Sequence, residues 1–176
     1  MSEATMRYGT SPGVARRSTH ALREGITVGL IGAAIVMLWF FIVDLAAGVP
    51  LRTPALLGAA LFDGARYVDA TPTARLVAGY TAVHLLGFVA LGVGVAGLFA
   101  LAEREKRVLA LIFMLGCCLA VVFLAMVYLL SQWLGQAMTP AIVLAGHILG
   151  AAAMVGALAY FHGRLLRRIP EALDGE

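Results

Sequence analysis

Four long runs of apolar residues dominate the chain, and shorter polar segments separate them. A helix that crosses a bilayer core of roughly 30 Å needs about 20 apolar residues. Each run is long enough, and each is bounded by glycine, proline or charged residues. The pattern predicts an all-α integral membrane protein whose four transmembrane helices form an up-down bundle. The predicted spans are residues 26–47, 76–101, 108–130 and 141–161, within a transmembrane domain of residues 25–163.

The two ends of the chain lie outside this predicted bundle. Residues 1–24 combine Ser, Thr, Gly and Pro with four arginines, a composition typical of a disordered basic tail. Arginines followed by an apolar run resemble a signal peptide, but this run is too long for one. We therefore expect an uncleaved anchor at the start of the chain and a short tail, residues 164–176, at its end.

Lys and Arg residues are distributed unevenly between the two sides of the predicted bundle. Ten lie in the two tails and the second loop, whereas the other side has three, which are Arg52, Arg66 and Arg75. Loops rich in basic residues stay on the cytoplasmic side of a membrane. The distribution predicts a multi-pass protein of a bacterial inner membrane with both termini in the cytoplasm.

The first external loop, residues 48–73, contains an apolar segment of its own. Thr53 followed by Pro54 is typical of the N-cap and first residue of a helix, and the apolar run 54–62 is too short to span a bilayer. We expect a short helix at the outer membrane interface. An irregular loop with buried leucines and a surface that docks a partner are the alternatives. The residues available for interfacial contact are Pro54, Leu56, Leu57, Leu61 and Phe62.

Composition agrees with an integral membrane protein and excludes a water-soluble one. Hydrophobic residues make up 61% of the chain and charged residues 13%, with a mean hydropathy of +0.92, too few charges for a water-soluble surface. The net charge of +3 does not indicate nucleic acid, because the basic residues flank the spans. The adjacent Cys117 and Cys118 lie in an apolar run and are interpreted as small core residues.

Three ionisable residues, Asp44, His84 and His147, fall within the predicted spans. A charged side chain costs about 2.5 to 3.5 kcal/mol there on insertion scales, so each needs an explanation. At 1.5 Å per residue, Asp44 lies about 5 Å from the outer end of its span, His84 about 12 Å and His147 about 10 Å. We expect Asp44 to reach the outer headgroups, paired with Arg52 or Arg75. A carboxylate that exchanges protons with one of the histidines is the alternative.

The two histidines have similar surroundings. Each begins the pattern His, aliphatic residue, Leu, Gly. The repetition suggests a duplicated helical hairpin, although spans one and three show no comparable match. Gly87 and Gly150 lie one helical turn from His84 and His147, on the same face. A missing side chain there leaves room for a flat ligand or for another helix.

Two interpretations of the histidine pair remain open. In the structural interpretation, neutral imidazoles hydrogen-bond to a carbonyl, to Asp44, to Tyr80 or to each other, and Gly146-x-x-x-Gly150 packs against a neighbouring helix. In the other, His84 and His147 are metal ligands that hold one b-type haem from opposite sides, with Gly87 and Gly150 leaving space for it.

The sequence contains none of the motifs that mark catalytic sites, so we do not expect an enzyme. It predicts a non-enzymatic polytopic membrane protein, a structural or accessory subunit of a larger membrane complex. Its expected partners are the lipid bilayer and other membrane subunits or further copies of itself, and not nucleic acid. The first alternative is a haem b electron-transfer subunit that uses His84 and His147. The second is a small transporter or channel, disfavoured by the scarcity of charges at mid-membrane depth.

Overall fold

The computed structural model describes residues 12–64, 70–102 and 139–161, and every regular element in these ranges is a helix. The helices are α1 (Pro12–Ala46), α2 (Arg52–Asp63), α3 (Ala74–Ala102) and α5 (Pro140–Phe161). Three segments are long and apolar enough to cross a membrane, namely His20–Ala46, Ala74–Leu98 and Pro140–Phe161. They confirm the helical class and coincide with the first, second and fourth predicted spans. The third predicted span, 108–130, lies outside the described residues, and so do Cys117 and Cys118.

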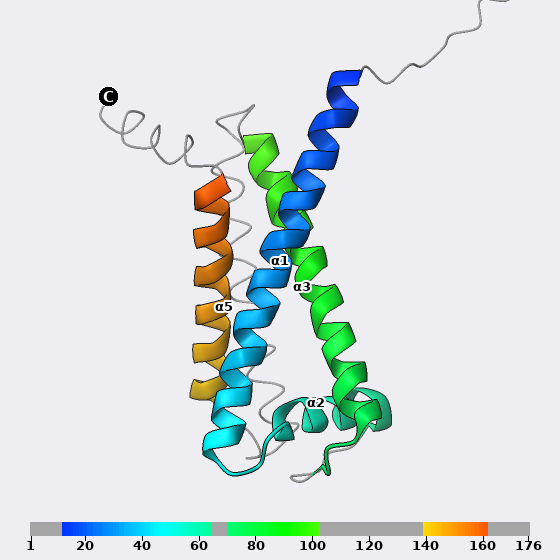
Figure 1. The fold of residues 1–176 in the computed structure, drawn as a ribbon, viewed down its shortest axis with the longest axis vertical. Helices are drawn as coiled ribbons and strands as arrows, with labels where there is room; N and C mark the ends of the chain where they lie inside the picture. Colours follow the sequence, from blue (N-terminus) through cyan, green and yellow to red (C-terminus); the bar gives the residue numbers. More distant parts are fainter. Residues whose placement is uncertain (1–11, 65–69, 103–138, 162–176) are drawn as a thin grey trace, which may run out of the picture.

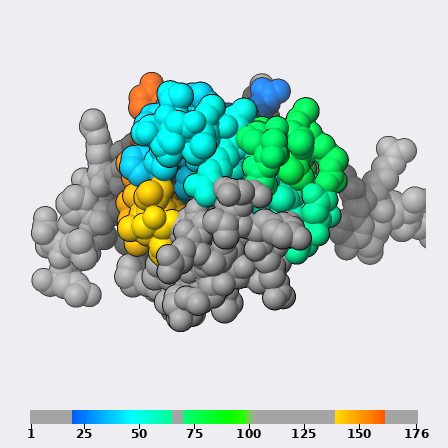
Figure 2. All heavy atoms as spheres, turned by 90° about the horizontal axis from the view of Figure 1, so that it is seen from below, coloured from blue at the N-terminus to red at the C-terminus, as the bar shows by residue number. Residues whose placement is uncertain are grey.

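Helix α1 contacts both α3 and α5. In Figure 1, α3 and α5 run in the direction opposite to α1. α3 crosses α1 near one end of the molecule and diverges from it toward the other end, where α2 lies across the opening. In the end-on view of Figure 2, α2 spreads between the ends of α1 and α3, and the first turns of α5, in yellow, lie beside α1.

Helix α1 begins earlier than the predicted span. Residues 12–24, which composition predicts to be disordered, are part of it. Pro12 suits the first position of a helix, and the Ala, Leu and Arg residues that follow have high helix propensity. His20 and Glu24 face each other one turn apart, with Nδ1 3.1 Å from Oε1. Local helix preference therefore extends α1 beyond its apolar run.

Glycines bring α1 and α3 together at their crossing. A Cβ added to Gly92 would lie 2.6 Å from the backbone nitrogen of Gly29, and one added to Gly25 would lie 2.8 Å from that of Val93. A Cβ on Gly29 would likewise overlap the backbone of Phe88. The two backbones are in direct contact, the usual effect of small residues between membrane helices.

Helix α5 packs on another face of α1. Gly146 lies against the Trp39 ring and Gly150 against Val36. The Trp39 indole N–H donates to the carbonyl oxygen of Ile142 at 3.0 Å. The helix contact predicted for the Gly146-x-x-x-Gly150 motif is therefore confirmed. A buried cluster from all three long helices continues the packing, and its members are Val28, Ala96, Met154 and Leu158.

A tight turn joins α1 to α2. The N–H groups of Val49 and Gly48 donate to the carbonyl oxygens of Asp44 and Leu45, each at 3.0 Å. Gly48 has φ +74°, so the turn is a Schellman motif, in which a left-handed glycine ends the helix. Leu51 also has a left-handed φ of 65°. These two reversals point the chain back across the end of the bundle.

Candidate functional site

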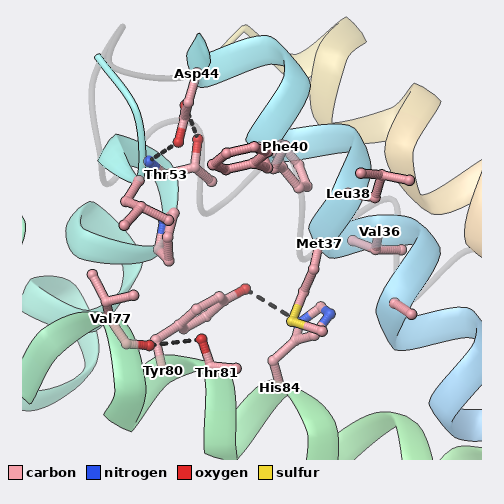
Figure 3. A pocket seen from close by; sticks show the side chains of 14 residues that line it. Val36, Met37, Leu38, Phe40, Asp44, Thr53, Val77, Tyr80, Thr81 and His84 are labelled. Atoms are coloured by element: carbon pink, nitrogen blue, oxygen red, sulfur yellow. Dashed lines mark hydrogen bonds between the residues drawn. The ribbon is translucent and has the colours of Figure 1, made fainter. Parts of the chain in front are cut away.

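Asp44 is almost fully buried in the last turn of α1, with 4% of its surface exposed. Its Oδ2 accepts the Thr53 N–H and its Oδ1 accepts the Thr53 hydroxyl, each at 2.7 Å. Hydrogen bonds to a charged group are stronger than neutral ones, and the carboxylate also meets the positive N-terminal end of α2. Figure 3 shows Asp44 and Thr53 joining the two helices. Asp44 therefore acts as a cap that holds α2 on α1.

The start of α2 differs from the sequence prediction. The helix begins at Arg52 rather than at Pro54, and Leu51 occupies the N-cap position without a side-chain hydrogen bond. Thr53 is thus inside the helix and does not cap it. The capping oxygens come from Asp44, because a carboxylate accepts both donors of Thr53 at once.

The predicted ion pair of Asp44 is wrong for one of its two expected partners, and the pairing with Arg52 stays a prediction. Arg75, one of its two expected partners, forms an ion pair with Asp63 instead. Both carboxylate oxygens of Asp44 are bonded to Thr53. Both oxygens of this acid therefore bond to a neutral residue of the next helix, a contact that sequence spacing did not reveal.

His84 projects from α3 beside two aromatic residues. Its Nδ1 lies 3.4 Å from the Tyr80 hydroxyl oxygen, a long hydrogen-bond distance. Its ring centroid lies 4.7 Å from that of Phe88. The other ring nitrogen, Nε2, is buried and has no hydrogen-bond partner among the residues that the structure describes. A buried nitrogen of this kind calls for an explanation.

His147 bonds within its own helix. Its Nδ1 lies 2.8 Å from the carbonyl oxygen of Val143, one turn earlier, and its ring meets Phe40 edge-on with centroids 6.4 Å apart. The two imidazoles are also close enough to interact electrostatically. The carbonyl contact of His147 and the Tyr80 contact of His84 are both contacts that the structural interpretation predicts.

The two glycines next to the histidines are placed differently from each other. Gly150 faces Val36, which fills the space beside it. Gly87 is exposed, and no atom within the described ranges lies within 4 Å of a Cβ added there. The reason is that α3 turns a row with four-residue spacing toward α1, which includes His84 and Phe88 but not Gly87. Val36 therefore fills the space predicted for a haem beside Gly150. The space beside Gly87 faces outward.

Haem binding by His84 and His147 stays a prediction. In the part of the chain that the structure describes, no group of three or more His, Cys, Asp or Glu side chains is arranged to hold a metal ion. The repeated pattern lies in α3 and α5, whereas the duplicated hairpin that it suggests also includes the third predicted span, which lies outside the described ranges.

A pocket of about 370 Å³ lies where α1 and α3 diverge. Figure 3 shows α1 and α3 on opposite sides of it and the start of α2 at one end. Most of its lining is apolar, and its polar residues are Asp44, Thr53, Tyr80, Thr81 and His84. Sites for small molecules are typically apolar pockets of roughly 300 to 1,000 Å³ with a few polar groups. The sequence indicated the Tyr80–His84 pair, but not the divergence of the helices that opens the pocket.

The residues of α2 that were predicted to make interfacial contacts differ in exposure. Leu56 is buried within the chain, with 2% exposed, and Pro54 and Leu57 are half-buried. Leu61 and Phe62 are exposed, by 53% and 44%. Only the last part of α2 therefore offers large apolar side chains to lipid or to a partner.

Comparisons with models of known protein families, with curated protein sequences and with solved structures found no match to this chain.

Proposed function

We propose that the protein is a non-enzymatic membrane protein that serves as a structural or accessory subunit of a larger membrane complex. Its partner binds the outward side of α3, along what we name the α3 strip. The strip consists of the small residues Gly87, Ala90, Gly94 and Gly97, all of them exposed. Because successive members are three or four residues apart, they lie on one side of the helix.

One contrast between glycines carries this proposal. The glycines at the α1–α3 crossing are in contact with a neighbouring backbone. A Cβ added to Gly87, Gly94 or Gly97 meets no atom within 4 Å in the described ranges. Glycine in a helix costs about 0.8 to 1.0 kcal/mol relative to alanine, and close contact with a second helix offsets that cost. The open strip is the kind of surface on which a partner helix packs.

The remaining parts of the proposal concern placement in the membrane. The predicted span 108–130 would complete a four-helix bundle in a bacterial inner membrane, with both termini in the cytoplasm. The distribution of basic residues supports this orientation. We place α2 at the outer interface, where the exposed Leu61 and Phe62 can contact lipid or the partner.

Replacing Ala90 with isoleucine tests the role of the α3 strip. The added side chain prevents close approach of a second helix, so the partner should be lost. The full-length chain is extracted from its native membranes in mild detergent, and its mass is measured by size-exclusion chromatography with light scattering. We expect the wild-type chain to elute in a complex and Ala90→Ile to elute as a single chain.

Ala82→Ile is the matched control. Ala82 is an exposed alanine of the same helix, about 80° around the axis from Ala90, so this variant should keep the complex. Equal loss of the complex in both variants would contradict the proposal. A wild-type protein that is a single chain in every mild detergent would contradict it as well.

A haem b electron-transfer subunit is the second candidate, because the Nε2 atom of His84 is buried without a partner in the described part of the chain. The same purified protein provides its test. A bound haem gives a strong visible absorption band that His84→Ala and His147→Ala should remove. A wild-type protein without such a band excludes this candidate.

A further inference from the structure

We propose that the pocket between α1, α2 and α3 binds the ring of a lipid-soluble quinone. This inference concerns a different face of the molecule from the α3 strip and does not depend on the partner. It rests on the location of the pocket, the polar groups that remain available in it, and the shape of its walls.

The rim of the pocket is apolar and faces outward. Ala34, Leu38 and Phe41 line the pocket and are exposed on the surface of α1. α1 and α3 are long and apolar enough to cross a membrane, so in a bilayer this rim meets hydrocarbon. A ligand of the pocket therefore enters from the lipid phase and is itself lipid-soluble.

Most polar groups of the pocket already form hydrogen bonds within the protein. The Asp44 carboxylate and the Thr53 hydroxyl bond to each other. The Thr81 hydroxyl donates to the carbonyl oxygen of Val77 at 2.7 Å. Among the described residues, the Tyr80 hydroxyl has only its long 3.4 Å contact with the His84 imidazole, which also lies near the backbone of Ala33. They are the groups to which a ligand can bond.

The Tyr80–His84 pair can hydrogen-bond to a ligand oxygen that is either a carbonyl or a hydroxyl. When the Tyr80 hydroxyl points at the Nδ1 atom of His84, its oxygen can accept a hydrogen bond from a ligand hydroxyl. When the hydroxyl turns away, it donates to a ligand carbonyl. A quinone has carbonyls when oxidised and hydroxyls when reduced, so both forms fit this site. An acyl chain would use neither group.

The walls suit a flat ring. The side chains of Phe40, Phe41 and Met37 line the pocket together with the Tyr80 ring. Aromatic and thioether groups make favourable contacts with the faces and edges of rings. The volume of about 370 Å³ is within the range of small-molecule sites, which leaves the tail of the quinone to extend through the rim into lipid.

The test uses the full-length protein in phosphatidylcholine nanodiscs with 2,3-dimethoxy-5-methyl-6-decyl-1,4-benzoquinone as the probe. The quinone retained is measured by chromatography and compared with empty discs, which corrects for partition into lipid. We expect about one quinone per chain above the empty-disc value. Tyr80→Phe should weaken binding roughly fivefold, because it removes one hydrogen bond without changing the ring. Ala34→Phe fills the mouth and should reduce retention to that of empty discs.

Ala152→Phe is the control for an added ring on an exposed helix face, since Ala152 is exposed on α5, and it should bind as the wild type does. Decylbenzene has a ring and tail without oxygens, and tetradecanoic acid has a chain without a ring, so neither should displace the quinone at equal concentration. Circular dichroism confirms that each variant is helical; if Ala34→Phe is not, Tyr80→Phe decides. No retention above empty discs, retention unchanged in Tyr80→Phe, or displacement by tetradecanoic acid overturns the proposal.

Discussion

The carbonyl oxygen and the carboxylate of Asp44 act on two successive helices. The carbonyl accepts the Val49 N–H in the turn that ends α1. The carboxylate accepts both donors of Thr53 at the start of α2. A buried charge is stable only when its hydrogen bonds are made. The fold therefore supplies a structural role for the acid in the first span.

Asp44→Asn should destabilise the protein. An asparagine can accept the Thr53 N–H with its oxygen and donate from its NH₂ group to the Thr53 hydroxyl oxygen, but both hydrogen bonds then become neutral and the charge at the end of α2 is lost. Hydrogen bonds to charged groups contribute about 1.5 to 3 kcal/mol each. We expect the apparent Tm of the purified protein in detergent to fall by about 5 °C.

Asp63→Asn provides the comparison, because it removes an acid from an exposed ion pair with Arg75. Exposed pairs contribute about 0 to 1 kcal/mol, so its Tm should change by no more than about 2 °C. If Asp44→Asn is as stable as the wild type, or if Asp63→Asn is the less stable variant, the cap assigned to Asp44 does not stabilise the protein.

The sequence identified Asp44 as a residue that needed a partner but did not identify the partner. Thr53 is brought to it by the glycine turn and by the left-handed Leu51, a conformation that leucine rarely adopts. The histidine contacts were easier to foresee, because a bond to Tyr80 or to a carbonyl one turn earlier arises within a single helix. Contacts inside a helix follow from spacing, whereas contacts across a turn depend on backbone conformation.

At the scale of the element, α3 has one face that packs toward α1 and another that is exposed. The inward face is a row with four-residue spacing, made of residues that are buried or half-buried: Leu76, Tyr80, His84, Phe88, Gly92 and Ala96. The outward face carries the α3 strip. Gly92 and Gly94 are two positions apart, and only Gly92 faces α1. The same residue type therefore has a packing role on one face and an open surface on the other.

Gly92→Ala and Gly94→Ala make a matched pair of substitutions in the purified chain. An alanine at Gly92 would overlap the backbone of Gly29, so α1 and α3 must separate and the Tm should fall by several degrees. An alanine at Gly94 meets no atom of the described ranges, and its better helix propensity should leave the Tm unchanged or slightly higher. Thermal unfolding in detergent distinguishes them, and equal destabilisation would contradict the assigned crossing.

Helix positions were predicted better than helix contacts. The three apolar runs coincide with α1, α3 and α5 because the bilayer thickness sets the length of a span. The early start of α1 at Pro12 was missed, since polar composition concealed its helix propensity. The Gly25-x-x-x-Gly29 motif at the crossing was also missed, because glycines are common on every face of these helices.

At the scale of the whole molecule, α1 and α3 are in contact at one end and apart at the other. Glycines allow the close approach at the crossing. At the open end α2 lies between the two helices, held to α1 by Asp44 and to α3 by the approach of Gly58 to Leu76. The pocket is the space that this divergence leaves. Its residues come from three helices, so no single run of sequence could indicate it.

Photo-cross-linking from the α3 strip tests the central claim, that a partner helix covers this strip, in intact native membranes. A photoreactive phenylalanine derivative is placed at Ala90 or, as the reference, at Ala82. After illumination, the mass of the cross-linked product is read from denaturing gels and its components by mass spectrometry. We predict one discrete protein adduct from position 90 and none from position 82. Lipid adducts alone from position 90, or the same protein adduct from both positions, would contradict the proposed partner surface.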